Sequence, residues 1–210
     1  MELMRWFADL VLHLDSHLVE LLVNYGFWVY LILFAIIFAE TGFVVTPFLP
    51  GDSLLFAAGA LAAVDTSGTL SAPLVSLTLI AAAVAGNTTN YHIGRWVGPP
   101  AFSGKYRFLK VDYLRRTEAF FEKHGSMTIV MSRFVPIIRT CAPFVAGIGR
   151  MPYARFQAYN FAGGAAWVLL LTWAGYFFGN LPLIKNNFGL VTIGIIVISL
   201  LPMAWVALRK

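Results

Sequence analysis

Charged side chains are scarce in this chain: only 12% of its 210 residues are Asp, Glu, Lys or Arg, whereas 59% are hydrophobic. In a soluble globular domain roughly a quarter of the residues are charged. The scarcity excludes an ordinary soluble domain, and the mean hydropathy of +0.76 indicates an all-α polytopic membrane protein. The length allows about four to six membrane-embedded segments of ~20 residues and no sizeable soluble domain.

Cysteine is almost absent, because Cys141 is the only one. A single cysteine excludes an internal disulfide and any metal site built on several thiolates, so we interpret Cys141 as a small packing residue. The sequence also lacks HExxH, P-loop and GxSxG motifs and any cluster of metal ligands. We therefore expect no catalytic residue, no metal and no cofactor, and the protein is not interpreted as an enzyme.

A soluble basic domain is missing too, although the net charge is +5. Six of the 15 Lys and Arg residues lie in one polar loop, residues 98–125, between hydrophobic segments, which argues against a nucleic-acid partner. The N-terminus has no uninterrupted apolar core, because Asp9, Asp15 and Glu20 interrupt it, so no cleavable signal is expected. Apolar residues recur there every three or four positions, which predicts an amphipathic helix over residues 1–17 at the membrane interface.

Long apolar runs are plentiful. About four stretches can each cross a bilayer: Leu18–Ala39, Ala72–Val97, Tyr153–Phe178 and Phe188–Leu208. Two further apolar segments are broken by helix-breaking residues. Residues 41–64 contain Pro47, Pro50 and Gly51, and residues 126–149 contain Pro136 and Pro143.

The broken segments carry charges that hydrocarbon does not tolerate cheaply. Glu40 and Asp52 lie at the first, and Arg133 and Arg139 lie in the second. Each charge at membrane depth costs about 2.5–3.5 kcal/mol on insertion scales, and such residues usually face a partner, a cavity or a substrate. Backbone N–H and C=O groups freed by a helix break are also tolerated at membrane depth only where protein or water binds them. We predict two re-entrant hairpins that form a transport site; a kinked helix that crosses fully is the alternative for each.

The distribution of bases favours the re-entrant arrangement. Suppose that each broken segment leaves the membrane on the same side that it entered. Twelve bases then share the side of the termini, and only Lys185 lies opposite. The twelve are Arg5, Arg95, Lys105, Arg107, Lys110, Arg115, Arg116, Lys123, Arg150, Arg155, Arg209 and Lys210. The side rich in Lys and Arg is cytoplasmic, so both termini are predicted to be inside.

The two halves of the chain also resemble each other. FAAGAL at Phe56–Leu61 has a counterpart in FVAGIG at Phe144–Gly149, each at the end of a broken segment. In the predicted topology one hairpin enters from outside and the other from inside. This is an inverted repeat, an arrangement in which many transporters place the substrate near the midplane.

The chain resembles the DedA family of bacterial inner-membrane proteins, also called the SNARE-associated or VTT-domain family. The resemblance covers nearly the whole chain, as a single domain over residues 1–210. Its most specific part is the string R-F-x-P-x-x-R-x-x-x-P-x-x-A-G, and the matching segments are ETGFVVTPFLPGDSLLFAAGAL from Glu40, GNTTNYHIGRWVG from Gly86, FEKHGSMTIVMSRFVPIIRTCAPFVAGIGRM from Phe121 and YNFAGGAAWVLLLTWAGYFFG from Tyr159.

The resemblance implies lipid transport in the cell envelope. Bacterial members are linked to the return of undecaprenyl phosphate to the inner leaflet and to maintenance of the proton motive force, and eukaryotic relatives are scramblases. The family's essential acids fall on Glu40 and Asp52, and its essential arginines fall on Arg133 and Arg139. One departure is Asn87, where many relatives have an acid, so no carboxylate can act there in this chain.

The four charges suggest a mechanism. Arg133 and Arg139 are candidates for binding a lipid phosphate, because a guanidinium stays charged and offers a planar fork of donors. Snorkelling, or an ion pair with Glu40 or Asp52, is the alternative. The acids are candidates for proton coupling, since burial favours the neutral carboxylic acid while a nearby arginine favours the carboxylate. The alternative for them is a fixed charge partner; Asp52 also suits a helix cap.

Other residues and functions are weighed against this hypothesis. We interpret a set of helix breakers and close-packing residues as architectural: Pro50, Gly51, Pro136, Pro143 and Gly147. The rival functions are a passive phospholipid scramblase and a membrane lipid-phosphate phosphatase, although neither broken segment has a histidine for the latter. The sequence leaves open which lipid is carried, whether H⁺, Na⁺ or neither drives transport, and whether the protein is a homo-oligomer.

Overall fold

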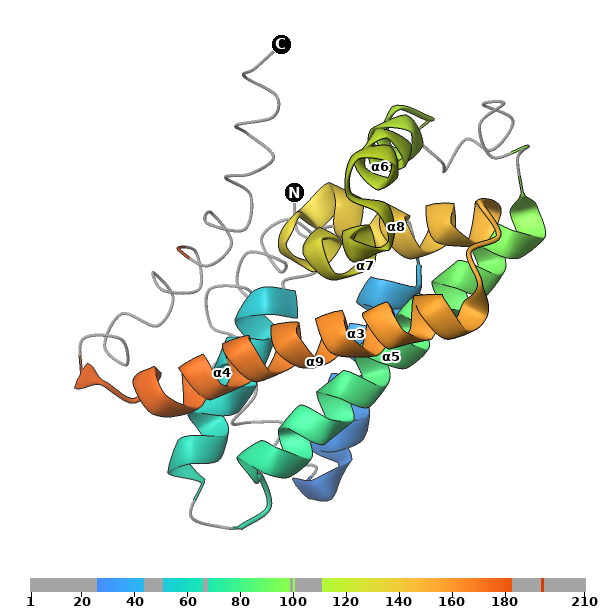
Figure 1. The fold of residues 1–210 in the computed structure, drawn as a ribbon. Helices are drawn as coiled ribbons and strands as arrows, with labels where there is room; N and C mark the ends of the chain where they lie inside the picture. Colours follow the sequence, from blue (N-terminus) through green and yellow to red (C-terminus); the bar gives the residue numbers. More distant parts are fainter. Residues whose placement is uncertain are drawn as a thin grey trace, which may run out of the picture. The chain divides into compact units, whose positions relative to one another are not determined.

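A computed structural model describes residues 26–43, 51–65, 68–98, 100, 111–182 and 194. Every regular element in these ranges is a helix, which confirms the predicted all-α class for this part of the chain (Figure 1). The predicted amphipathic helix over residues 1–17, the span Phe188–Leu208 apart from Gly194, and residues 99 and 101–110 of the basic loop lie outside the described residues.

The elements follow one another as short and long helices. In order they are η1 (Gly26–Trp28), α3 (Val29–Gly42), α4 (Gly51–Val64), α5 (Ala72–Val97), α6 (Val111–His124), η3 (Gly125–Met127), α7 (Thr128–Met131), η4 (Ser132–Phe134), α8 (Pro136–Ile148) and α9 (Tyr153–Phe178). Contacts group them into two compact units. Unit 1 contains the described residues that fall within 26–34, 51–79 and 168–194, and unit 2 contains those that fall within 35–43 and 80–167.

Within the described residues, two helices are long and apolar enough to cross a membrane. They are α5 and α9, each of 26 residues, and their bounds are those predicted from the sequence. At 1.5 Å per residue each helix is about 39 Å long, which exceeds the ~30 Å hydrocarbon core of a bilayer. The re-entrant course of the broken segments and the total number of spans stay predictions.

The second broken segment is a helix interrupted at a proline. The helical turns of α7 and η4 end at Phe134, Val135 is extended with φ −127° and ψ 103°, and α8 begins at Pro136. A residue before proline is driven out of the helical region, whereas proline itself fits the first turn of a new helix. Pro143 lies within α8, which nevertheless continues to Ile148.

The first broken segment is described at its two ends. The helix α3 continues to Gly42, three residues past the predicted end at Ala39, so Glu40 lies in a helical turn. The helix α4 begins at Gly51, and Asp52 is the acidic residue of its first turn, where a negative charge interacts favourably with the helix dipole. Pro47 and Pro50 lie outside the described residues.

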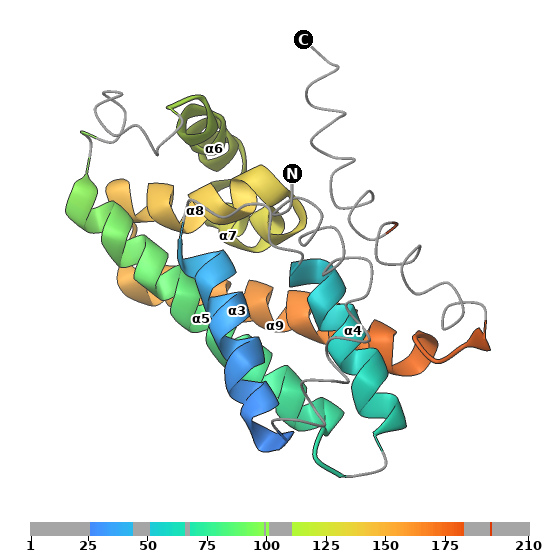
Figure 2. The same cartoon turned by 180° about the vertical axis from the view of Figure 1, so that it is seen from behind.

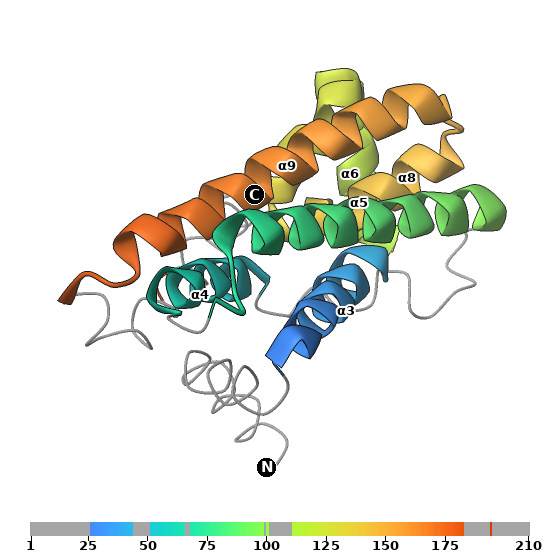
Figure 3. The ribbon, with the colours of Figure 1, turned by 90° about the horizontal axis from the view of Figure 1, so that it is seen from below.

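In unit 1, α4 packs against the C-terminal half of α9 through glycines (Figure 3). A Cβ added to Gly59 would overlap the carbonyl of Thr172, and one added to Gly175 would overlap the carbonyl of Phe56. Small residues of this kind let helix backbones approach closely, a common device in membrane proteins.

Unit 2 repeats this contact with α8 and the C-terminal half of α5. A Cβ on Gly147 would overlap the carbonyl of Tyr91, and one on Gly94 would overlap the carbonyl of Phe144. The spacing of three residues from aromatic to glycine in FAAGAL and FVAGIG is therefore used twice in the same way. Each unit thus holds one copy of the repeated contact, while the inverted orientation of the copies stays a prediction.

A glycine-to-alanine pair tests this contact. Gly147→Ala is expected to destabilise the protein by about 3 kcal/mol, because the added methyl group meets rigid backbone rather than a movable side chain. Gly149→Ala is the control, since a Cβ there would meet no atom closer than 3.4 Å. Thermal unfolding of both variants in detergent measures the difference, and equal melting temperatures would contradict the close-packing role.

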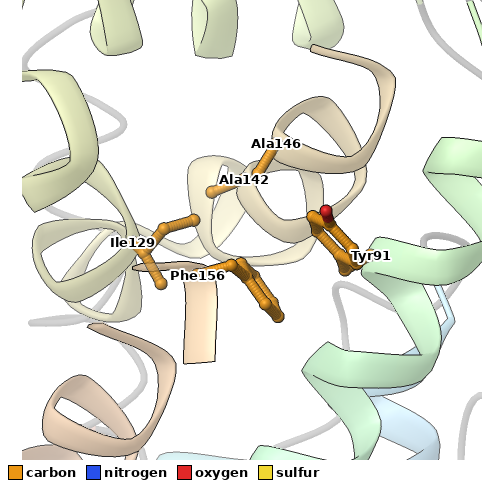
Figure 4. Packing of buried hydrophobic residues seen from close by; sticks show 5 residues of the cluster. All are labelled: Tyr91, Ile129, Ala142, Ala146 and Phe156. Carbon is orange, nitrogen blue, oxygen red and sulfur yellow. The ribbon is translucent and has the colours of Figure 1, made fainter. Parts of the chain in front are cut away.

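The core of unit 2 joins α5, α7, α8 and α9. Tyr91 stacks on Phe156 with ring centroids 4.4 Å apart, and Ile129, Ala142 and Ala146 pack around them (Figure 4). Phe121 of α6 packs against the same cluster, so α6 covers α8 with its apolar side. This core fixes the segment from η4 to α8, which carries both arginines.

Candidate functional site

Glu40 is placed by a close approach between α3 and α5. The last turns of α3 lie against α5 (Figure 2), because Gly86 has no side chain to hold them apart. A Cβ on Gly86 would lie 2.9 Å from the carbonyl oxygen of Phe38 and would overlap Thr41 Oγ1. As a result the Glu40 side chain is buried in unit 2, with only 1% of its surface exposed.

Glu40 forms a buried ion pair with Arg139. The Nη2 atom of Arg139 donates to Oε1 of Glu40 at 2.7 Å, and the two side chains are 7% and 1% exposed. Arg139 lies in the first turns of α8, just after the break before Pro136. Both members of this pair lie in unit 2, whereas Asp52 lies in unit 1.

Asn90 ties the backbones on both sides of this pair together. Its Nδ2 donates to the carbonyl oxygens of Thr41 and Thr140 at 3.3 and 2.8 Å. Thr41 follows Glu40 and Thr140 follows Arg139, so one buried amide of α5 fixes both partners. Pro143 has no N–H to donate to the carbonyl of Arg139 four residues before it, and Asn90 reaches the neighbouring carbonyl, that of Thr140.

Arg133 is a buried cation with neutral acceptors. It lies in η4 with 2% of its surface exposed, and its Nη2 donates to Asn160 Oδ1 at 2.8 Å and to the Ala83 carbonyl at 3.4 Å. Its Nε and Nη1 atoms have no hydrogen-bond partner among the residues that the structure describes. Burying a charge costs several kcal/mol unless it is compensated, so these donors favour an incoming anion.

One indole ring brings the two arginines together. The Cζ atoms of Arg133 and Arg139 lie over the buried Trp167 ring, 5.7 and 5.3 Å from its centroid. Cations within about 6 Å of an indole centroid are attracted by its negative face. Both arginines therefore lie at one aromatic ring, and Trp167 is a residue of the candidate site that the sequence did not single out.

A pair of asparagines completes the site, and one of them, Asn160, was also missed. Asn160 Oδ1 accepts from Asn87 Nδ2 at 3.0 Å as well as from Arg133, and both asparagines are buried. Asn87 is the position where the resemblance suggested an acid; here it supports Asn160 as a neutral donor. The signal available in the sequence was the presence of amide side chains within two long apolar helices, where polar groups are expensive and usually functional.

The site therefore has hydrogen-bond donors and charge suited to an anion. It offers one guanidinium with free donors, a second guanidinium paired with a carboxylate, and an aromatic ring between them. In the described part of the chain no group of three or more His, Cys, Asp and Glu residues could hold a metal ion. Guanidinium donors match phosphate oxygens in geometry and charge.

Comparisons with known proteins identify the family of the chain. Residues 49–177 match the VTT domain. The chain is 52% identical to protein DedA of Escherichia coli (strain K12) over 96% of this chain and 92% of that protein. It is 43% identical to an uncharacterised membrane protein of Mycobacterium leprae (strain TN), over 80% and 74% of the two chains.

Inner membrane protein YghB of Escherichia coli (strain K12) is also similar, with 36% identity over 87% of this chain and 79% of that protein. No solved structure matches the chain. The domain match covers more than half of the sequence, and the relatives are similar over most of their length. The chain is therefore a membrane protein of the VTT-domain family, to which protein DedA belongs.

Proposed function

We propose that this protein is a lipid transporter that returns a polyprenyl phosphate carrier, of the undecaprenyl phosphate type, from the outer to the inner leaflet of the bacterial inner membrane. The observation that supports this most directly is Arg133. A fully buried guanidinium with neutral acceptors and unused donors is suited to a phosphate group. A lipid tail would remain in the bilayer while its headgroup reaches the arginine.

The ion pair between Arg139 and Glu40 gives the site two states, one with Arg139 bound to the Glu40 carboxylate and one with Arg139 bound to a phosphate. An incoming phosphate competes with the Glu40 carboxylate for Arg139, because both are anions that a guanidinium binds. The displaced carboxylate then lies buried without its cation, and burial favours its protonation. Uptake of a phosphate and uptake of a proton are thus linked at one pair of side chains. Asp52 is proposed as a second acid in this coupling.

The transport experiment uses purified protein in liposomes that contain a fluorescent polyprenyl phosphate. Movement of the lipid between leaflets without release of inorganic phosphate supports a transporter. Release of phosphate would instead indicate a phosphatase. Movement of uncharged polyprenol at the same rate would indicate a scramblase that does not recognise the phosphate, and this would contradict the proposed role of Arg133.

The proposed orientation places both termini and the basic loop in the cytoplasm. Ser71 ends the loop between α4 and α5; its side chain is exposed, its backbone N–H donates to Tyr30 Oη at 3.0 Å, and its carbonyl oxygen accepts from the Val75 N–H at 2.9 Å. Ser71→Cys is therefore expected to react with an impermeant maleimide applied to intact spheroplasts. Lys123→Cys, exposed on α6, is expected to react only after permeabilisation.

The native Cys141 gives little background in this labelling, because it is buried. The opposite pattern, with Lys123→Cys labelled from outside, would overturn the orientation. Labelling of both positions from outside would place the segment from α5 to α6 in a different topology and would remove the re-entrant arrangement.

A further inference from the structure

One face of α9 surrounds the Arg133 guanidinium. Asn160, Gly164 and Trp167 are spaced by four and three residues, which places them on the same side of a helix. Asn160 accepts from Arg133 Nη2 at 2.8 Å, a Cβ on Gly164 would lie 3.3 Å from the same atom, and the Trp167 ring centroid is 5.7 Å from Cζ. We call these three residues the α9 cradle.

The Asn160 amide has its orientation fixed by its other partners. Its Nδ2 donates to the Val84 carbonyl at 3.1 Å and to Gln157 Oε1 at 3.1 Å, and neither of these oxygens can donate in return. The oxygen Oδ1 must therefore face Arg133, where Asn87 supplies a second donor at 3.0 Å. Asn160, with 0% of its surface exposed, is a rigid acceptor for one guanidinium nitrogen.

Gly164 and Trp167 limit the guanidinium on its other sides. A methyl group at Gly164 would lie 3.6 Å from Cζ, so the guanidinium rests almost directly on the α9 backbone. Trp167 adds a buried aromatic ring that attracts the cation through its face and does not occupy a hydrogen-bond donor of the guanidinium. Together the cradle holds Nη2 and leaves Nε and Nη1 without partners among the described residues.

The members of the α9 cradle are all neutral, and this sets Arg133 apart from Arg139. Arg139 already has a carboxylate partner in Glu40, whereas the two oxygens that hold Arg133 belong to an amide side chain and a peptide group. A neutral acceptor orients a guanidinium but does not cancel its charge. A carboxylate in place of the Asn160 amide would accept the same hydrogen bond and would also form an ion pair with Arg133.

We propose that Asn160 is a specificity-determining positioning residue: the α9 cradle aims Arg133 at the anionic headgroup and, by staying neutral, reserves the charge of Arg133 for the phosphate. This inference rests on the proposed function, because it assigns a role toward the same lipid phosphate. It predicts that the phosphate selectivity of the protein depends on the absence of charge at Asn160, and on the space left by Gly164.

The experiment compares the affinity of detergent-purified protein for a short polyprenyl phosphate with its affinity for the corresponding polyprenol. Asn160→Asp is expected to lower the phosphate affinity about tenfold or more while polyprenol affinity is unchanged, because the new carboxylate competes with the phosphate. Asn180→Asp is a matched control. Asn180 Nδ2 also donates to a backbone carbonyl at 3.1 Å, that of Ala60 in unit 1, so it loses the same type of bond and gains the same charge.

Gly164→Ala is the second variant, and it decides the matter if Asn160→Asp does not fold. It removes no hydrogen bond but displaces the guanidinium by a few tenths of an ångström, so a selective loss of phosphate affinity of about threefold is expected. A purely structural role would lower both affinities together or only the melting temperature.

The outcomes distinguish failure of the proposed function from failure of the α9 cradle inference. If the wild-type protein binds the phosphate no better than the alcohol, the proposed function fails. If the wild type and Asn180→Asp both prefer the phosphate, and Asn160→Asp and Gly164→Ala keep that preference, the α9 cradle inference is wrong while the proposed function stands. Loss of preference in Asn160→Asp or Gly164→Ala but not in Asn180→Asp supports the inference.

Discussion

Arg133→Lys is expected to lose polyprenyl phosphate binding by about a hundredfold although the positive charge is kept. An ammonium group has its three N–H donors on a single nitrogen, so it lacks the planar fork in which one guanidinium nitrogen holds Asn160 while two others face a phosphate. Hydrogen bonds to charged groups contribute about 1.5–3 kcal/mol each, and the loss of one or two of them corresponds to a change of this size. Binding of a short polyprenyl phosphate to purified protein measures it.

The matched control for this substitution is Arg155→Lys. Arg155 is exposed on the first turn of α9, so its replacement keeps the charge and touches no part of the site. Near wild-type binding is expected there. If Arg133→Lys also bound like the wild type, a point charge would be sufficient and the guanidinium geometry would carry no function. Full transport by Arg133→Ala would remove the phosphate-binding role altogether.

The parts of the fold that the sequence predicted well are those with a strong local signal. The bounds of α5 and α9 were predicted because each is a long apolar run that ends before a glycine: α5 at Val97 before Gly98, and α9 at Phe178 before Gly179. The interruption at Pro136 was predicted because proline restricts its own backbone and that of its neighbour. Such rules act over a few residues and need no tertiary information.

The site was predicted only in part, because its geometry depends on contacts between distant segments. The sequence offered Glu40 and Asp52 as partners for the arginines but could not choose between them. The pair between Arg139 and Glu40 depends on the close approach of α3 to α5 at Gly86. The sequence did not reveal this approach, because a glycine in a long helix is also compatible with other packing and functional roles.

Asn160 and Trp167 were missed for a related reason. An asparagine or tryptophan within an apolar helix fits packing and interface roles as well as a site, and the pattern alone shows no partner. Only the fold reveals that Asn160 and Trp167 lie on the helix face next to Arg133. Polar residues inside candidate membrane helices are candidates for a functional site just as the four charged residues are, since burying them is also costly.

Glu40→Gln is expected to keep transporting the lipid but to lose the acceleration that an imposed pH gradient gives the wild type. The amide retains an oxygen that can accept from Arg139, so the local packing survives while the proton-binding group is removed. Inward movement of an anionic phosphate is opposed by a membrane potential that is negative inside, by about 2.3 kcal/mol per charge at 100 mV. A proton taken up at Glu40 together with the phosphate would cancel that charge.

Uptake of fluorescent polyprenyl phosphate into proteoliposomes, with and without a pH difference, measures this coupling. Asp52→Asn tests the second acid in the same assay, and Glu118→Gln is the control, because Glu118 is an exposed carboxylate on α6 outside the site. A gradient response that survives in Glu40→Gln but is lost in Asp52→Asn would move the proton-binding role to Asp52. Wild-type uptake that ignores the gradient, with both neutral variants fully active, would leave Glu40 as a fixed partner of Arg139. Transport would then be passive, and the buried ion pair would serve to hold α3 against α8 rather than to carry a proton.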